Sequence, residues 1–490
     1  MKYDVIIGLE IHAELKTASK MFCSCANGAG MAPNSATCPI CLGHPGTLPV
    51  PNKRAIELNI LLGLAYNCQI NYLSKFDRKN YFYPDLPKGY QISQYDLPFA
   101  HHGKINLGGE DILITRIHLE EDTGKSFHPK NADYTLLDFN RAGAPLLELV
   151  TEPTIRSAEE AKKFCQNYQR VLRYLGASNA DMEKGEMRCE ANISLQESGA
   201  WKYENGQILV IGEKKLNPKV EVKNINSFKA VEKAILYEIE RQTKELENGQ
   251  EIIAETRGWD DSKNVTTSQR IKESAADYRY FPEPDIPPIL IDDQWLKKIK
   301  KELIELPEEK KIRFQRDFNL KEEIADQLVA DFQLAKFSEE VFVFLNKEKK
   351  SELATNAAGW ITSELLKNLN IGNIQISEAK ISPADFAKLI IIINTGKITS
   401  NVGQEVLSKM LIEGKGAEEI IKNSGLEKIS DRKIISELAE KIINLFPNQA
   451  NEYRNGKLPL MAFFLGKLMA ETGGKADPTI AKECLEEKLK

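Results

Sequence analysis

The chain has 490 residues, of which 42% are hydrophobic and 28% are charged, and its formal net charge is −5. This composition is typical of a soluble globular protein with about two to four domains. The sequence contains no apolar run of about 18 residues, so we expect no membrane span. The acidic balance argues against bulk, nonspecific nucleic-acid binding, although it leaves room for a local basic patch.

The compartment is predicted from the N-terminus and from the cysteines. Residues Met1–Gly8 contain too short an apolar run for a signal peptide and lack the Arg- and Ser-rich helix of a transit peptide. Cys68, Cys165, Cys189 and Cys484 are scattered and follow no disulfide framework. We therefore expect a reducing, cytoplasmic location.

Residues 1–290 read as α+β, because short apolar runs alternate with clusters of Gly, Pro and Asn. One helix is predicted over Ser157–Leu175, with Ser157 as N-cap, Glu160 in a capping box and Gly176 after its end. A second helix is predicted from about Ser227 to Asn248, where apolar residues recur at helical spacing. Few other helices are expected in this part of the chain.

The proline-rich segment Phe281–Pro288 reads as a rigid, extended boundary. Beyond it the sequence is helical almost throughout, with predicted helix starts at Pro307, Ser338 and Ser382. A glycine-containing break, Glu413–Ala417, separates a last helical portion. The predicted domains are 1–294, a helical linking domain at 295–412 and a helical tail at 413–490.

Half of the eight cysteines form two close pairs near the N-terminus. Their spacing is that of a four-thiolate site, and zinc is the expected ion. Because four cysteines close the coordination sphere, we interpret the site as structural rather than catalytic. The predicted Zn²⁺ ligands are Cys23, Cys25, Cys38 and Cys41.

A strand over Gly8–Glu14 is predicted to place Glu10, His12 and Glu14 on one face, since side chains alternate along a strand. Two carboxylates and an imidazole would then lie together. On this fragment alone, a solvated face of a half-buried strand is the more ordinary explanation.

A second acidic cluster, Glu120–Asp122, precedes a Gly-Lys pair, and Glu148 lies within an apolar run. A carboxylate in such a run is costly to bury unless it is paired or binds a cation. Carboxylates with one imidazole suit Mg²⁺. The alternative is that Glu148 meets an internal arginine such as Arg141, and spacing alone leaves both possibilities open.

The stretch Lys75–Gln94 interleaves basic and aromatic side chains. Such a pattern fits phosphate binding and base stacking, although aromatic-rich loops more often pack on their own domain. The sequence contains no P-loop and no Gly-x-Ser-x-Gly elbow. A bound nucleotide would therefore be held through Mg²⁺ and Lys or Arg side chains.

The chain contains several ordered strings that include Ile7–His12, Ser74–Pro84, Leu119–Lys125, Asp138–Arg141, Arg188–Ser194 and Lys223–Phe228. Together they resemble the B subunits of the bacterial aspartyl/glutamyl-tRNA amidotransferases, and the resemblance covers essentially the whole chain. It implies an antiparallel-sheet cradle similar to the glutamine synthetase and guanido kinase fold, followed by all-α domains.

The resemblance also implies an activity and partners. A protein of this family binds misacylated Glu-tRNA(Gln) or Asp-tRNA(Asn), phosphorylates the side-chain carboxyl with ATP, and lets ammonia displace the phosphate. A separate amidase (A) subunit would release ammonia from glutamine and pass it through a channel, and a small (C) subunit would complete a heterotrimer. A noncatalytic tRNA-docking scaffold within the same complex is the alternative function.

By the same resemblance, His12, Glu121 and Glu148 are expected to bind Mg²⁺, with Glu10 beside them. The cradle would place the remaining polar residues around the same cavity. Lys79 and Lys88 are expected to contact phosphate, and Arg188, Glu190 and Asn192 to face the site.

The tail from Tyr453 onward carries seven Lys and Arg against five Asp and Glu, which is a net charge of +2 on an acidic chain. From charge alone this is an ordinary solvated helical face. Its resemblance to the family's tRNA-binding tail domain favours RNA contact instead. The residues expected to make that contact are Arg454, Lys457, Lys467 and Lys475.

Overall fold

The computed structural model describes residues 2–27, 30–271 and 278–490, and the chain divides into two compact units, Met1–Glu308 and Glu309–Lys490. None of the described helices is long and apolar enough to cross a membrane. The sequence placed the first boundary at residue 294. The structure extends the first unit further, because α4 (Asp293–Lys300) buries Leu296 and Ile299 in its core.

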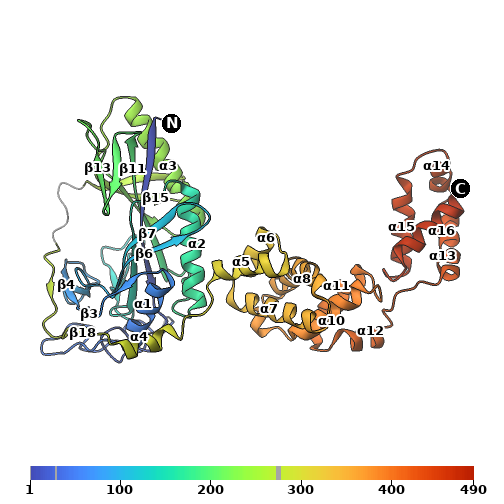
Figure 1. The fold of residues 1–490 in the computed structure, drawn as a ribbon, viewed down its shortest axis with the longest axis horizontal. Helices are drawn as coiled ribbons and strands as arrows, with labels where there is room; N and C mark the ends of the chain where they lie inside the picture. Colours follow the sequence, from blue (N-terminus) through green and yellow to red (C-terminus); the bar gives the residue numbers. More distant parts are fainter. Residues whose placement is uncertain (1, 28–29, 272–277) are drawn as a thin grey trace. The chain divides into compact units, whose positions relative to one another are not determined.

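A nine-stranded sheet forms the centre of the first unit (Figure 1). The α+β class predicted from the sequence is therefore confirmed. Neighbouring described strands are antiparallel except β14 and β15, which run parallel. In spatial order the strands are β16 (Val265–Ile271), β15 (Glu255–Asp260), β14 (Val220–Ile225), β11 (Met187–Glu197), β1 (Tyr3–Glu14), β10 (Pro145–Thr151), β7 (Asp111–Glu121), β6 (Ala100–Asn106) and β2 (Gln69–Ile70).

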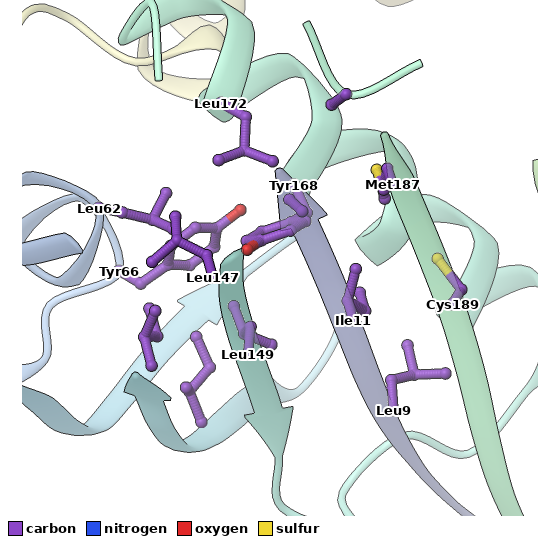
Figure 2. Packing of buried hydrophobic residues seen from close by; sticks show 14 of the residues in the cluster. Leu9, Ile11, Leu62, Tyr66, Leu147, Leu149, Tyr168, Leu172, Met187 and Cys189 are labelled. Atoms are coloured by element: carbon purple, nitrogen blue, oxygen red, sulfur yellow. The ribbon is translucent and has the colours of Figure 1, made fainter. Parts of the chain in front are cut away.

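Helices cover the apolar face of this sheet. Leu9 and Ile11 of β1 point into a core that also receives Tyr168 from α2 (Ala158–Tyr174) and Tyr66, which caps the end of α1 (Lys53–Ala65) (Figure 2). The long helix α3 (Phe228–Glu247) packs against α2 and β11. Since the buried residues of β1 alternate with half-buried ones, the opposite face of the sheet is left for polar side chains.

Both helices predicted in this unit are confirmed. The Ser157 side chain accepts a hydrogen bond from the Glu160 amide at the start of α2, and Ser227 does the same for Ala230 at the start of α3. These caps satisfy amide groups that would otherwise have no partner in the first helical turn.

Four smaller sheets belong to the first unit. The segment that the sequence marked as an extended boundary contributes β17, which pairs with β4, and the Glu283 carboxylate accepts from Arg78 at 2.7 Å. The strand pairing and this hydrogen bond attach the segment to the first unit. The small sheets contain β17 (Phe281–Pro282), β4 (Asp77–Asn80) and β5 (Tyr90–Ser93); β18 (Ile289–Leu290) and β3 (Leu73–Ser74); β8 (Lys125–Phe127) and β9 (Leu136–Asp138); and β12 (Trp201–Glu204) and β13 (Gln207–Val210).

The second unit is helical in its described residues. Two hydrophobic clusters organise it, one spanning positions 314–426 and one spanning 435–489. The predicted boundary at residue 413 falls inside the first cluster, since α12 contributes Ala417 and Ile420 to it. The helices are α5 (Pro307–Phe318), α6 (Glu322–Leu328), α7 (Phe332–Lys347), η1 (Ser351–Leu353), α8 (Ala354–Trp360), η2 (Ile361–Leu365), α9 (Leu366–Gly372), η3 (Ile376–Glu378), α10 (Pro383–Asn394), α11 (Ser400–Glu413), α12 (Ala417–Ser424), α13 (Arg432–Leu445), α14 (Pro447–Arg454), α15 (Leu460–Glu471) and α16 (Pro478–Leu489).

One predicted helix start in this unit is wrong. The sequence suggested that Ser338 begins a helix, but α7 begins at Phe332 and is capped by Asp331, which accepts from the Leu334 amide. Ser338 is fully buried and donates its hydroxyl hydrogen to the Leu334 carbonyl one turn earlier. The predicted starts at Pro307 and Pro383, the latter with Ser382 as cap, are confirmed.

Candidate active site

The polar face of the sheet carries a row of three side chains from adjacent strands. His12 on β1 pairs in register with Glu148 on β10, and Glu148 pairs with His118 on β7. The Nε2 atoms of His12 and His118 each lie 3.3 Å from the same oxygen of Glu148. Glu148 is only 4% exposed, so this carboxylate is buried between two imidazoles.

Two further carboxylates complete the cluster. Glu120 on β7 places Oε1 3.8 Å from His12 Nε2, and its other oxygen lies 3.5 Å from Lys79 Nζ. Glu10 lies two residues before His12 and therefore on the same face of β1. We call Glu10, His12, His118, Glu120 and Glu148 the acidic centre.

The charges of the acidic centre are strongly coupled. Burial opposes the charged form of His12, but the hydrogen bond and charge of Glu148, aided by Glu120 and Glu10, raise the pKa of His12 to about 9. Burial likewise opposes ionisation of Glu148, yet His118 and His12 hold its pKa well below the usual range. Burial and then the charge of Glu148 raise the pKa of Glu10 to about 7. A proton on His12 therefore balances part of the negative charge of these carboxylates.

The acidic centre contains two overlapping sets of candidate cation ligands. Glu10, His12 and Glu148 form one set, and His118, Glu120 and Glu148 form the other, with the ligand atoms of each set within 4.8 Å of one another. Carboxylate oxygens with imidazole nitrogen can hold Mg²⁺ or a similar divalent ion. The donor set therefore fits the predicted cation, with Glu148 common to both sets.

Glu121 is not brought to this cluster. It follows Glu120 on β7 and points to the other side, where its carboxylate accepts from the Ile92 amide at 2.9 Å and pairs with Lys88. Among the described residues, no set of candidate ligands includes Glu121. The structure thus places Glu121, which the resemblance implied as a cation ligand, on the other side of β7 from His12 and Glu148.

His118 and Glu120 were missed as site residues, although a signal for them existed. The order His118-Leu119-Glu120 alternates polar and apolar residues, as Glu10-Ile11-His12 does. In β7 this places Leu119 in the core and the two polar side chains on the opposite face.

Arg141 does not neutralise Glu148, so the specific alternative suggested by the sequence is wrong. The Arg141 guanidinium lies 3.3 Å from Asp122 and hydrogen-bonds to the Thr123 and Gly124 carbonyls. The arginine near Glu148 is Arg116, at 3.9 Å. The two histidines are closer and make the main contacts.

β11 supplies three more residues of the predicted site. Its register with β1 sets Arg188 opposite His12, Glu190 opposite Glu10 and Asn192 opposite Gly8, on the polar face of the sheet. Arg188 reaches Asp122 at 3.5 Å, and Glu190 pairs with Lys223 at 2.8 Å. β11 thus extends the polar face beside the acidic centre.

The two lysines expected to bind phosphate are both held by carboxylates. Lys79 is 18% exposed at its side chain and pairs with Glu120, whereas Lys88 is 8% exposed and pairs with Glu121. Glu120 and Glu148 hold the pKa of Lys79 well above its usual range although burial opposes this. Lys79 is therefore a permanent cation at the edge of the acidic centre.

The four predicted zinc ligands come together. The sulfur atoms of Cys23, Cys25, Cys38 and Cys41 lie within 4.8 Å of one another, and those of Cys38 and Cys41 are 3.9 Å apart. A tetrahedron with Zn–S bonds of about 2.3 Å has sulfur–sulfur edges of about 3.8 Å. The four thiols therefore fit a structural zinc ion.

The predicted RNA-binding residues of the tail have different surroundings. Arg454 hydrogen-bonds to the Leu489 and Lys488 carbonyls at the end of α16, and Lys457 pairs with Glu452 at 2.8 Å. Lys467 is exposed on α15 and stands over the ring of Phe446. Lys475 is half-buried. Arg454 thus has a structural role that the sequence did not suggest.

Comparison with known proteins agrees with this architecture. A family model described as the GatB/GatE catalytic domain matches residues 5–297, and one described as the GatB domain matches residues 340–489. The first match spans the sheet and the whole acidic centre, which defines the class as a protein with a GatB/GatE catalytic domain.

Curated relatives extend the similarity to the full length. The B subunits of the aspartyl/glutamyl-tRNA(Asn/Gln) amidotransferases from Thermotoga petrophila and Thermodesulfovibrio yellowstonii are each 44% identical over all of this chain, covering 99% and 100% of their own lengths. The corresponding protein from Thermosipho melanesiensis is 46% identical over 99% of this chain and 98% of its own length. The chain belongs to the GatB family, and the resemblance drawn from its sequence is confirmed.

Proposed function

We propose that this chain is the component of a tRNA-dependent amidotransferase that activates and amidates Glu-tRNA(Gln), Asp-tRNA(Asn) or both. The observation that carries the proposal is the acidic centre, in which Glu148 lies 3.3 Å from each of two imidazoles beside the cation Lys79. A cluster of candidate metal ligands next to a permanently charged lysine can neutralise phosphate charge, and this suits phosphoryl transfer without a P-loop.

The proposed reaction has two steps. A side-chain carboxylate oxygen of the misattached Glu or Asp attacks the γ-phosphorus of ATP, the bond to ADP breaks, and an acyl phosphate forms. Ammonia then attacks the carbonyl carbon, phosphate leaves, and the nitrogen loses a proton to give the amide. Both steps gather negative charge at one place, so the site must supply compensating positive charge.

Residues of this chain provide the setting. Mg²⁺, when bound, screens the repulsion between carboxylate and phosphate. Glu10, His12 and Glu148 would hold the ion, and Glu120 would add negative charge beside them. Lys79 would turn from Glu120 toward a phosphoryl oxygen, and Arg188 on β11 would orient the second anion.

The remaining assignments belong to the same proposal. The four cysteines hold a structural zinc ion, and the helical tail contacts tRNA through Lys467 and Lys475. An amidase subunit and a small third subunit would complete a cytoplasmic heterotrimer, with ammonia delivered by a channel. The three-domain division of the chain, with its last boundary near residue 413, is retained as a prediction.

The test uses the assembled complex and follows amide formation on misacylated tRNA with ATP and an ammonium salt, which bypasses the amidase. Glu10→Gln and Glu148→Gln should abolish product while leaving tRNA affinity near normal. Glu159→Gln serves as the control, since its side chain is 69% exposed on α2. Full activity in both Glu10 and Glu148 variants would instead support a noncatalytic docking role.

A further inference from the structure

Five tyrosines beside the acidic centre form an unbroken series of ring contacts. They flank three short strands, since two follow β4, one follows β5 and two precede β17. The Asn80 amide donates to the Tyr278 carbonyl and fastens two of these segments together. In order of contact, this tyrosine strip consists of Tyr83, Tyr81, Tyr278, Tyr280 and Tyr95.

The geometry of the strip leaves aromatic surface available. Tyr95 and Tyr280 stack nearly parallel, with ring centroids 4.4 Å apart and an interplanar angle of 13°. At the two ends of the strip, Tyr83 is 66% exposed and Tyr95 is 58% exposed. A parallel stack that ends in an exposed ring can be continued by another flat ring.

The middle of the strip touches the acidic centre. Lys79, which lies 3.5 Å from Glu120, also stands 5.4 Å from the centroid of the Tyr278 ring. Burial raises the pKa of Tyr280 to about 12, with Lys79 opposing the shift and Glu120 adding to it. The strip therefore leads from solvent to the place where the proposed reaction occurs.

We propose that the tyrosine strip binds the unpaired 3′ end of the RNA substrate by stacking its bases on the tyrosine rings. The inference rests on the proposed function, which requires an amino acid esterified to that 3′ end to reach the acidic centre. Unpaired RNA ends are bound in this way by aromatic side chains, with little demand on sequence. Within the strip the Tyr95–Tyr280 contact is parallel and the other three contacts are edge-to-face, so a base would stack on the exposed face of Tyr95.

The experiment measures equilibrium binding of uncharged tRNA to the assembled complex without ATP. Tyr95→Ala should weaken binding by about 5-fold to 100-fold, the range found when one stacked base loses its aromatic partner. Tyr95→Phe keeps the ring and should keep the affinity. Tyr134→Ala is the matched control, because Tyr134 is 59% exposed on another part of the unit. A tRNA that lacks its unpaired 3′ nucleotides should bind wild type and Tyr95→Ala equally.

Three results would overturn the inference. The first is unchanged affinity of Tyr95→Ala and Tyr83→Ala for intact tRNA. The second is weaker ATP binding with normal tRNA binding, which would assign the strip to the adenine of ATP. The third is loss of a partner protein from the complex, which would make the strip a protein interface. Because binding is measured without ATP or an amino acid, failure of the proposed chemistry would leave this result unaffected.

Discussion

The neighbouring residues Glu120 and Glu121 provide a sharp test of the acidic centre. Each carboxylate is buried and each pairs with one lysine, Glu120 with Lys79 and Glu121 with Lys88. Glu120 faces His12, whereas Glu121 faces the Ile92 amide. Substituting each with Gln therefore removes the same charge from opposite faces of β7.

The two variants should cost similar stability but differ in cation affinity. Removing the paired carboxylate from a lysine whose side chain is 18% exposed (Lys79) or 8% exposed (Lys88) costs on the order of 3 kcal/mol in either case. We take the 3.8 Å between His12 and Glu120 as the distance from Glu120 to a cation bound at His12. Two unit charges at that distance interact by about 4 kcal/mol at an effective dielectric constant of about 20. If desolvation offsets half of this, Glu120→Gln weakens binding of a divalent ion by about 30-fold. Glu121→Gln should change it by less than about 3-fold.

The assay is titration of the purified complex with Mn²⁺, followed by paramagnetic resonance, with thermal melting of each variant as the folding control. Glu120→Asp keeps the charge and should recover part of the affinity. Equal loss in the Glu120→Gln and Glu121→Gln variants would refute the placement of the cation on the face of His12. A larger loss for Glu121→Gln would restore the assignment made from the sequence.

Three further outcomes are expected. The pKa of His12 is raised to about 9, so its proton must leave before a cation binds. Cation affinity should therefore rise about tenfold per pH unit from pH 7 to 9. An affinity that does not change above pH 7 would mean that the pKa of His12 is not raised. Below pH 7, protonation of Glu10, whose pKa is about 7, should steepen the dependence. Cys38→Ser should lower the zinc content measured by mass spectrometry and the melting temperature of the first unit, and a zinc-free variant with unchanged melting would contradict a structural role. Lys467→Ala and Lys475→Ala should each weaken tRNA binding across sequences and reduce the magnitude of its salt slope by about 1; an unchanged slope would remove the tail from the interface.

Local patterns predicted much of the first unit because they depend on short-range physics. The alternation in Gly8–Glu14 correctly placed Glu10 and His12 on one face, since side-chain direction along a strand has a period of two. Caps at Ser157 and Ser382 located two helix starts, because a side-chain oxygen there satisfies a free amide. These signals need no knowledge of the tertiary structure.

The failures arose where tertiary packing decides between equivalent local choices. Ser338 has a capping residue's chemistry, yet it lies inside α7, where its hydroxyl is satisfied by the Leu334 carbonyl. The run Glu120–Asp122 contains no alternation by itself, so the choice among its carboxylates depends on the preceding order His118-Leu119-Glu120. The pairing of β7 with β10 sets His118 opposite Glu148 and so places the face of His118 and Glu120 at the acidic centre.

The cysteine cluster and the acidic segment Glu121–Asp122, which follows Glu120 on β7, are connected through one glycine. Gly143 has φ +84°, a conformation that favours glycine, and a Cβ there would lie 3.3 Å from Cys41 and 3.8 Å from a Glu121 oxygen. Its amide donates to the Asp122 carbonyl, and its carbonyl accepts from the Met21 amide. The turn that follows β7 is therefore held between the cysteine cluster and the acidic segment. A metal that fixes the cysteines would therefore also hold the turn at the end of β7.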